Sequence, residues 1–310
     1  MKPSARLVSW THDPVETIYS LWEASKTNKP IRTVAEIKAE CAANPEFNAE
    51  VRGLFRKIIT DNIPLAENLN FVFILDNVSI AFREQMVRHR IGVKIGDRLG
   101  VDMFPDVHDS TWWSQSMRVL NMGNFSDNEG YHIPTSISKT ETARDYYKHV
   151  MDKIQDSYNR LSAMGIPDED ARMVIPLAAT HRISWGMNLT TMSHIIHKRS
   201  CWVAQLDLWR PVIASMLDEV CAKVDPLFSL LATPPCLRGN TFTGCVHKAD
   251  SEERVQGRDP LPPCALYLKH VHAKENPLFE RQQPDYDEMC ADYAKFWRRD
   301  VHSGEAEVSK

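Results

Sequence analysis

The sequence has no long hydrophobic run, no regular cysteine pattern and no excess of positive charge. Its longest apolar stretches, such as residues 71–75, are far too short to span a bilayer, and the first residues lack the apolar stretch of a signal peptide. Seven cysteines, an odd number without regular spacing, argue against a disulfide framework and favour a reducing cytoplasm. A net charge of −4 offers no general attraction to nucleic acid or membrane, so an anionic ligand would need a local cluster of cations.

What the sequence does contain is enough apolar residues, 43% of 310, to bury a sizeable core. The spacing of these residues predicts strands over 7–10 and 69–76. It predicts helices that begin near Asp13-Pro14, that span 33–60 with a break near Asn44-Pro45, and that span 77–89.

The second half of the chain is predicted to be mostly helical. After loops over 91–113 and 121–137, a long helix is expected to start at a capping box of Ser138 and Glu141 and to end at Gly165. A short helix or turn over 168–175 precedes a helical region over 188–224. Beyond Pro234-Pro235 the composition shifts to proline, cysteine and charge, which indicates a separate segment.

Two groups of polar residues lie in the first half of the chain. Gln85 precedes the run of Arg88, His89 and Arg90, whose adjacent donors could hold phosphates or a polar ring edge. Cations also suit the C-terminus of any helix, so the run has a purely local explanation as well. Ser114, Ser116 and Arg118 would face one way on an extended segment, as a phosphate contact requires.

Two more groups follow in the second half. Arg172 and Arg182 have apolar neighbours in the sequence, where a charge needs a ligand or an internal ion pair as its partner. Asn188 and Arg199 would share one face of a helix, roughly 16 Å apart along it, which is long enough to touch two parts of a ligand. His194 lies off that face and in isolation is typical of a packed or solvated histidine.

Taken in this order, the four groups resemble the flavin-dependent thymidylate synthases (the ThyX family). The Gln-x-x-Arg-His-Arg run and the Ser-x-Arg segment match, and the similarity is unbroken from Gly165 to Arg199. The resemblance covers roughly residues 5–225. It implies an α+β, ThyX-like fold with a central antiparallel sheet flanked by helices, and hence a catalytic domain over 1–233 with a C-terminal extension over 234–310.

The resemblance also implies an activity. Family members convert dUMP to dTMP with FAD, NADPH and methylenetetrahydrofolate, as homotetramers whose active sites draw on several subunits. Arg199 would lie against the pyrimidine, where a guanidinium stabilises developing negative charge, while Ser116 and Arg118 would take the phosphate. Arg199 and Ser116 are therefore the expected catalytic residues. The expected FAD contacts are Arg88, His89, Arg90, Asn188, His194 and Ser25, and the expected dUMP contacts are Gln85, Ser116, Arg118, Arg172 and Arg199.

The chain departs from the family pattern beside these sites. The spacer over 91–113 is expanded, Ser114 replaces a glutamate, and Thr190 replaces an arginine expected to contact FAD. Three interpretations stay open: ordinary dTMP synthesis, a variant enzyme that makes a 5-hydroxymethyl pyrimidine nucleotide or acts on dCMP, and a non-catalytic nucleotide- or flavin-binding homologue. One hypothesis is that 91–113 forms a lid, with His108 or Asp109 near the substrate.

The C-terminal extension lies outside the resemblance. Its Cys236, Cys245, His247 and Cys264 are ligand types for zinc, but their spacing matches no Cys-x-x-Cys pattern, so no metal is assigned. The signatures of zinc-dependent nucleotide deaminases are absent from the sequence. A cap over the core or an oligomer contact is the simpler role for this extension.

Overall fold

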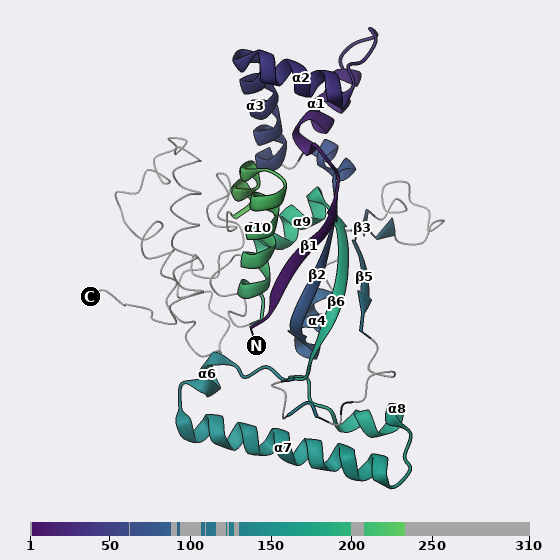
Figure 1. Cartoon of the computed structure of the whole chain (residues 1–310), viewed down its shortest axis with the longest axis vertical. Helices are drawn as coiled ribbons and strands as arrows, with labels where there is room; N and C mark the ends of the chain where they lie inside the picture. The colour runs from purple at the N-terminus through teal and green to yellow at the C-terminus, as the bar shows by residue number, and fades with distance from the viewer. Residues whose placement is uncertain are drawn as a thin grey trace, which may run out of the picture.

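The protein is described by a computed structural model at residues 2–61, 63–87, 92–93, 107–108, 110–115, 122, 124–126, 130–199 and 208–232. It has the predicted α+β architecture, built on a four-stranded antiparallel sheet with the strand order β1-β2-β6-β5 (Figure 1). The strands are β1 (Ser4–Trp10), β2 (Asn70–Ser79), β5 (Ser110–Ser114) and β6 (Thr180–Asn188). The two strands predicted from sequence are confirmed, and both are longer than predicted.

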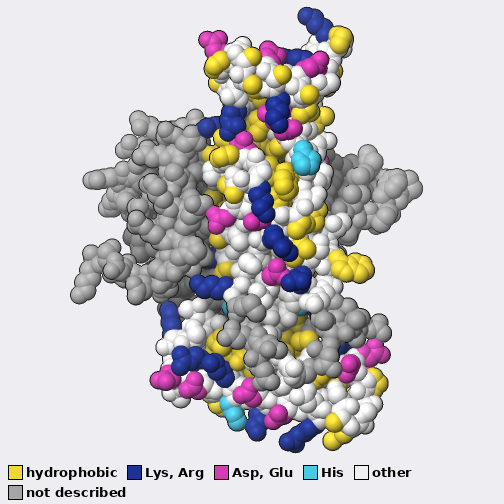
Figure 2. Space-filling model, viewed as in Figure 1, with side chains coloured by type: hydrophobic (Ala, Val, Ile, Leu, Met, Phe, Trp, Pro, Cys, Tyr) yellow, Lys and Arg dark blue, Asp and Glu magenta, His cyan; other side chains and the backbone are white. Residues whose placement is uncertain are grey.

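Helices cover one face of this sheet, and no helix in the described part of the chain covers the other. α4 (Ile80–Met86), α9 (Leu189–Arg199) and α10 (Arg210–Lys223) pack on the covered face together with the 3-10 helix η3 (Pro226–Ala232). Alternate sheet residues point into this core, and Phe71, Phe73 and Ile183 are completely buried. On the other face Arg6, Val8 and Arg182 are exposed, and Figure 2 shows hydrophobic and charged side chains side by side along it.

The edge strand β5 comes very close to β6 at one point. Thr111 pairs with Gly186, and a Cβ atom added to Gly186 would lie 2.8 Å from the Thr111 hydroxyl oxygen. Real Cβ atoms essentially never approach another atom so closely, so any larger residue at position 186 would force the Thr111 side chain or the strand that carries it to shift. Glycine therefore fits this position because of close strand packing rather than backbone freedom.

A helical cap lies beyond one end of the sheet (Figure 1). It consists of α1 (Pro14–Ala24), α2 (Val34–Ala43) and α3 (Pro45–Asp61), and the 3-10 helix η1 (Pro64–Asn68) follows it. The predicted break near Asn44 is confirmed, because the Asn44 Oδ1 atom accepts hydrogen bonds from the backbone N–H groups of Glu46 at 3.0 Å and Phe47 at 3.2 Å. Thr33 and Glu36 form a capping box at the start of α2.

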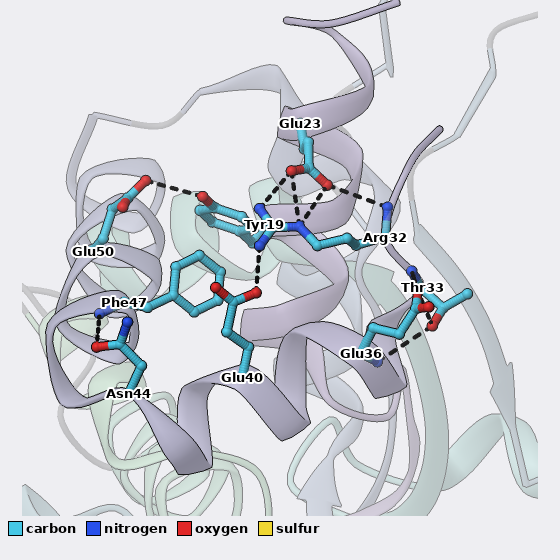
Figure 3. Close-up of polar contacts among 9 residues, drawn as sticks. All are labelled: Tyr19, Glu23, Arg32, Thr33, Glu36, Glu40, Asn44, Phe47 and Glu50. Atoms are coloured by element: carbon cyan, nitrogen blue, oxygen red, sulfur yellow. Dashed lines mark hydrogen bonds and ion pairs between the residues drawn. The ribbon is translucent and has the colours of Figure 1, made fainter. Parts of the chain in front are cut away.

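Arg32 holds the parts of this cap together (Figure 3). Its guanidinium lies 2.5 Å from both the Glu23 and the Glu40 carboxylates, and its Cζ atom lies 4.8 Å from the centroid of the Phe47 ring. The hydrogen bond to Glu23 is the main cause that raises the pKa of Arg32. The charges of Arg32, Glu23 and Glu40 are thus satisfied within the cap.

At the opposite end of the sheet lies an arm of helices, α6 (Thr135–Ser138), α7 (Glu141–Ala163), α8 (Asp168–Ala171) and the 3-10 helix η2 (Arg172–Val174). The apolar stripe predicted for α7 is confirmed, with Met151 and Tyr158 buried, and Gly165 ends the region with a φ of 82°. The predicted capping box is wrong. Ser138 ends α6, where its hydroxyl donates to the Thr135 carbonyl at 3.1 Å, and α7 begins after Thr140 without a side-chain cap.

Other predicted boundaries also change. The helix predicted over 77–89 begins only at Ile80, because residues 77–79 still pair with β6 or form the bulge that precedes that pairing. The supposed loop over 91–113 contains most of β5 and the paired two-residue strands β3 (Gly92–Val93) and β4 (Val107–His108). Part of the loop predicted over 121–137 is α6. Within the described residues no helix has the length and hydrophobicity needed to cross a membrane.

Candidate functional site

Two of the predicted nucleotide-binding residues, Gln85 and Arg199, meet at one tryptophan. Trp209, completely buried just before α10, donates a hydrogen bond from Nε1 to the Gln85 Oε1 atom at 2.8 Å. The Arg199 Cζ atom lies over the same indole ring, 4.4 Å from its centroid. The ends of α4 and α9 are therefore brought together by a residue that neither helix contains.

Arg199 occupies a partly desolvated position at the end of α9. Burial lowers the pKa of its guanidinium from the usual value. An arginine still carries its charge at neutral pH after such a change. A cation held against an aromatic face, away from bulk water, interacts more strongly with an anionic group than an exposed cation does. This is the electrostatic environment expected of a group that stabilises negative charge on a bound ring.

Asn188, predicted to contact FAD, lies at the other end of α9. It is the last residue of β6 and caps the helix: its Oδ1 atom accepts a hydrogen bond from the Thr191 backbone N–H at 2.8 Å. The prediction that Asn188 lies within a helix is therefore wrong, because residues 180–188 form a strand. The buried hydroxyl oxygens of Thr190 and Thr191, which follow it, have no hydrogen-bond partner in this part of the structure.

The predicted ligand-facing surface of α9 is also corrected. Met192 and Ile195, which lie between Asn188 and Arg199 on that face, are both completely buried in the core. Only the ends of the face can therefore meet a ligand. His194, off this face as predicted, is half-buried. The region predicted to be helical over 188–224 is two helices, since α9 ends at Arg199 and α10 begins at Arg210.

The two arginines with apolar neighbours have different surroundings. Arg182 is exposed on the uncovered sheet face and forms an ion pair with Asp76. Of the two partners considered from the sequence, a ligand or an internal ion pair, Arg182 therefore has the ion pair. Arg172 is half-buried on the arm, and for its guanidinium no ion pair or hydrogen bond is found among the described residues. Its neighbour Met173 is 82% exposed. Of the two, Arg172 is the one that retains the capacity to bind an anion.

Ser25, a predicted FAD contact, lies far from Arg172. It follows α1 in the helical cap, is exposed, and its hydroxyl donates to the Trp22 carbonyl at 2.7 Å. Figure 1 places the cap and the arm at opposite ends of the sheet, and between them lie α4, α9 and α10, whose ends carry or adjoin Gln85, Arg199 and Trp209. One chain therefore does not bring Ser25, Arg172 and Arg199 to a single position.

Several predicted site residues lie outside the described part of the chain. These include the proposed lid residue Asp109 and most of the expanded spacer. For His108 in β4 only the backbone pairing with Gly92 is known. Within the described residues, no three His, Cys, Asp or Glu side chains form a group that could hold a metal. The other residues outside are Arg88, His89, Arg90, Ser116, Arg118, Cys236, Cys245, His247 and Cys264.

Sequence reasoning missed Trp209 as a site residue. Its indole packs on Phe82 of α4, with ring centroids 4.4 Å apart, and on Trp185 of β6 at 6.4 Å. A tryptophan in the apolar run before a helix is typical of a core residue, so the sequence carries no signal that distinguishes this one. Its significance depends on contacts with residues 124 and 10 positions away, which only the fold supplies.

Comparison with known proteins bears directly on this site. The family model described as thymidylate synthase complementing protein matches residues 6–227. A flavin-dependent thymidylate synthase from Geobacter sulfurreducens is 31% identical over 173 residues, which cover 56% of this chain and 65% of that protein. One from Pyrococcus furiosus is 27% identical over 219 residues, covering 71% of this chain and 79% of that protein.

Among solved structures, a UMP/dUMP methylase, PolB from Streptomyces cacaoi bound with 5-Br dUMP, is similar with a TM-score of 0.49 and 15% identity. The similarity covers 73% of this chain and 93% of that one. The family match spans well over half of the chain and includes Gln85, Arg172, Asn188 and Arg199. This protein therefore belongs to the thymidylate synthase complementing protein family, the family of flavin-dependent thymidylate synthase enzymes.

Proposed function

We propose that this protein transfers a one-carbon unit to C5 of a pyrimidine deoxynucleotide, converting dUMP to dTMP with FAD, NADPH and methylenetetrahydrofolate. The observation that carries the proposal is the meeting of Gln85 and Arg199 on Trp209. The family match and the names of the relatives support the flavin and the reaction. Arg199 is assigned to stabilise negative charge on the pyrimidine, because its guanidinium is fixed and partly desolvated.

The start of α9 fits a flavin. Buried polar groups in proteins normally have hydrogen-bond partners, so the buried hydroxyl oxygens of Thr190 and Thr191 suggest a ligand beside them. Thr191 is completely buried, so of the two it is the half-buried Thr190 that, together with the Asn188 side chain, would face the polar edge of an isoalloxazine ring. A bound flavin would supply the redox chemistry, while these residues would hold and orient it. His194, Ser25 and the run from Arg88 to Arg90 are assigned to the same cofactor, and Ser116 and Arg118 to the phosphate.

A homotetramer with shared active sites is part of the proposal. Ser25 and Arg172 lie at opposite ends of the sheet, so several copies are needed to bring both to a site that contains Arg199. The arm near Arg172 also exposes large apolar side chains: Met164 at 74%, Met173 at 82% and Leu177 at 63%. Apolar groups concentrated in this way favour contact with another protein surface. A second copy docked there would carry Arg172 of one chain to the site of another.

The division of the chain and its location complete the proposal. Residues 1–233 are assigned as the catalytic domain, within which the family match falls, and 234–310 as an extension that caps it or contacts another subunit. A reducing cytoplasm suits the two cysteines that are described, Cys41 and Cys221, which are both free thiols.

The test is a mass measurement on the nucleotide. The full chain is purified, examined for flavin absorbance, and incubated with FAD, NADPH, methylenetetrahydrofolate and either dUMP or dCMP. A methyl-group gain on dUMP is the expected result. A hydroxymethyl gain, or a gain on dCMP alone, would replace the proposed reaction with the variant one. Protein that cannot be reconstituted with FAD would contradict the proposal altogether.

A non-catalytic role is the second candidate. It is favoured by Thr190, which stands where the family pattern has an arginine and has a buried hydroxyl without a partner in the described structure. In the same assay such a protein would bind flavin or nucleotide and leave the nucleotide mass unchanged. An inactive catalyst and a failed preparation are distinguished by measuring dUMP binding on the same sample.

A further inference from the structure

The strand β1 lies at one edge of the four-stranded sheet, where β2 is its only partner strand among the described residues. An edge strand presents unpaired N–H and C=O groups, which can pair with a strand of another molecule. In an antiparallel pair, alternate residues direct these groups away from the partner strand. In β1 two such residues are Ala5 and Leu7, whose N–H groups donate to side chains of α10. The outer edge of β1 therefore faces this helix (Figure 1).

Three side chains of α10, spaced four residues apart, meet the backbone of β1. The Ser215 hydroxyl oxygen accepts a hydrogen bond from the Ala5 N–H at 2.6 Å. The Glu219 carboxylate accepts one from the Leu7 N–H at 2.6 Å. The Lys223 Nζ atom donates to the Leu7 carbonyl at 3.4 Å and to Glu219 at 2.6 Å. Four residues of a helix rise by about 6 Å and two residues of a strand by about 6.7 Å, so the two sets of groups stay in step.

The chemistry of these side chains matches the edge as well as their spacing does. The Ser215 hydroxyl directs its one proton to the carbonyls of Pro211 at 2.9 Å and Val212 at 3.0 Å within α10, so its oxygen is left to accept from Ala5. The ionised carboxylate of Glu219 carries acceptors only. Both side chains are therefore suited to the N–H groups of a strand.

The positions on either side of this contact are unsuited to strand pairing. Pro3, two residues before Ala5, has no N–H to donate. The register of pairing with β2 shifts between Leu7 and Ser9, and such an irregularity also interrupts a ladder on the outer edge. The stretch of β1 that is able to pair with another strand is thus the stretch that α10 occupies.

We propose that Ser215, Glu219 and Lys223 block the addition of a strand from a second copy of this chain to the edge of β1. The three side chains occupy the backbone groups that an added strand would bind. A second copy is the partner that we infer, because two identical edges can pair antiparallel about a two-fold axis, with Ala5 and Leu7 on the same face in both. The inference concerns the sheet edge and does not depend on the reaction proposed above.

The test removes both acceptors from the full-length protein in the double variant Ser215→Ala, Glu219→Met. Hydrogen exchange, read by mass spectrometry with single-residue fragmentation, follows the backbone amides. Those of Ala5 and Leu7 should exchange roughly tenfold faster than in the wild type, the usual effect of losing one hydrogen bond, while Arg6, which alternates with them, should change little. Sedimentation velocity should show species larger than the wild-type assembly, in proportions that grow with protein concentration.

Two controls separate an open edge from other effects of the substitutions. Glu219→Gln keeps an oxygen that accepts from Leu7 and should resemble the wild type in both measurements. Glu50→Met makes the same exchange of carboxylate for thioether in the helical cap, where it removes a hydrogen bond from the Tyr19 hydroxyl. It should not enlarge the assembly. Ala5→Pro, added to the double variant, deletes an outward N–H group and should reduce the association.

Three results would overturn the inference. The first is unchanged exchange at Ala5 and Leu7 in the double variant, and the second is faster exchange there without any growth of the assembly. The third is equal growth in Glu50→Met, which would attribute association to added apolar surface. Thermal unfolding monitors the fold of each variant. If the double variant folds poorly, Ser215→Ala alone, which removes a single hydroxyl, should still accelerate exchange at Ala5 and enlarge the assembly, and failure to do so also overturns the inference.

Discussion

The polar side chains of the helical cap and those on the covered face of the sheet have different kinds of neighbours. In the cap, Arg32 lies between the carboxylates of Glu23 and Glu40, and the Tyr19 hydroxyl donates to Glu50 at 2.9 Å (Figure 3). On the sheet side, Arg199 is held by an aromatic ring, and the ring nitrogens of the buried His181 have no side-chain hydrogen-bond partner among the described residues.

The two arginines show the difference in their pKa values. Hydrogen bonds to carboxylates raise the pKa of Arg32, whereas burial lowers the pKa of Arg199. A cation surrounded by carboxylates contributes to stability and has little charge left for a ligand. Arg199, whose guanidinium lies on an aromatic ring and is partly desolvated, interacts more strongly with an anionic group that reaches it than an exposed cation would. The surroundings of a charged residue, rather than its type, therefore distinguish a structural arginine from a binding one.

The strongest test of this comparison is removal of Arg199. Arg199→Ala should reduce dUMP turnover by roughly 10²- to 10³-fold, the usual effect of deleting one group that stabilises developing charge. Steady-state kinetics on the FAD-loaded protein measure it. Thermal stability should change little, because the substitution also removes the cost of burying a cation. A variant that loses stability instead of activity would show that Arg199, like Arg32, stabilises the fold rather than binds a ligand.

His181 predicts a pH dependence of stability on the sheet side. Burial, with the nearby Arg83 as a second cause, lowers the pKa of His181 to about 4 from 6.5. The unfolded chain therefore takes up this proton near pH 6.5 and the folded chain only near pH 4, so stability falls as the pH drops between these values. At pH 4.5 the loss from this residue should be roughly 2 to 3 kcal/mol.

Urea unfolding of wild type and His181→Gln at pH 7.5 and pH 4.5 measures this contribution. The variant cannot titrate at this position, so its stability should depend less on pH by that amount. Equal pH dependence in both proteins would show that the imidazole is accommodated as a cation, for instance through the Val78 carbonyl, a contact that raises its pKa. In that case the sheet side would resemble the cap more than we infer.

Arg32→Ala should have the opposite effect to Arg199→Ala. Loss of its contacts with Glu23 and Glu40 should lower the free energy of unfolding by about 1 to 3 kcal/mol, since the three side chains are partly exposed and solvent screens the pairs. The affinity for dUMP should be unchanged below the unfolding temperature. Chemical denaturation and calorimetry on one preparation compare the two quantities. A selective loss of nucleotide binding would connect the cap to the site.

The smallest effect is expected from Thr33→Ala. The substitution removes the hydroxyl half of the capping box with Glu36 and should cost about 1 kcal/mol. Thr33→Ser, which keeps the hydroxyl, is the control and should be close to wild type in thermal unfolding. Equal losses in both variants would show that the threonine methyl group rather than the cap is important.

Sequence periodicity predicted most of this fold. The strand at 69–76, the break at Asn44 and the stop at Gly165 each depend on local chemistry, and all were found. The errors occurred where pairing over long distances decided the structure. No strand was predicted over 180–187, yet residues 180–188 form one because β2 and β5 pair with them on both sides. The predicted helix start at Asn188 failed for the same reason.

The candidate site was predicted only in part. The order of the polar groups pointed to Gln85 and Arg199 from their match to a family pattern, and the fold does bring them together. The sequence gives no indication of Trp209, because a tryptophan in an apolar run is indistinguishable from a core residue. Nor could it place Ser25 and Arg172 at opposite ends of the sheet, since that separation is a property of the topology.

The close packing at Gly186 has a consequence for the chain that leaves β5. Thr111 lies opposite a residue without a side chain, which favours the observed alignment of β5 with β6. A shift by one position would set the threonine against a larger neighbour and turn both tryptophans to the opposite faces. The Thr111–Gly186 contact thus specifies the register of β5 on β6. Residues 116–118, assigned to the nucleotide phosphate, follow β5 in the sequence. The absence of a Cβ atom at Gly186 therefore helps to determine the position from which that segment departs.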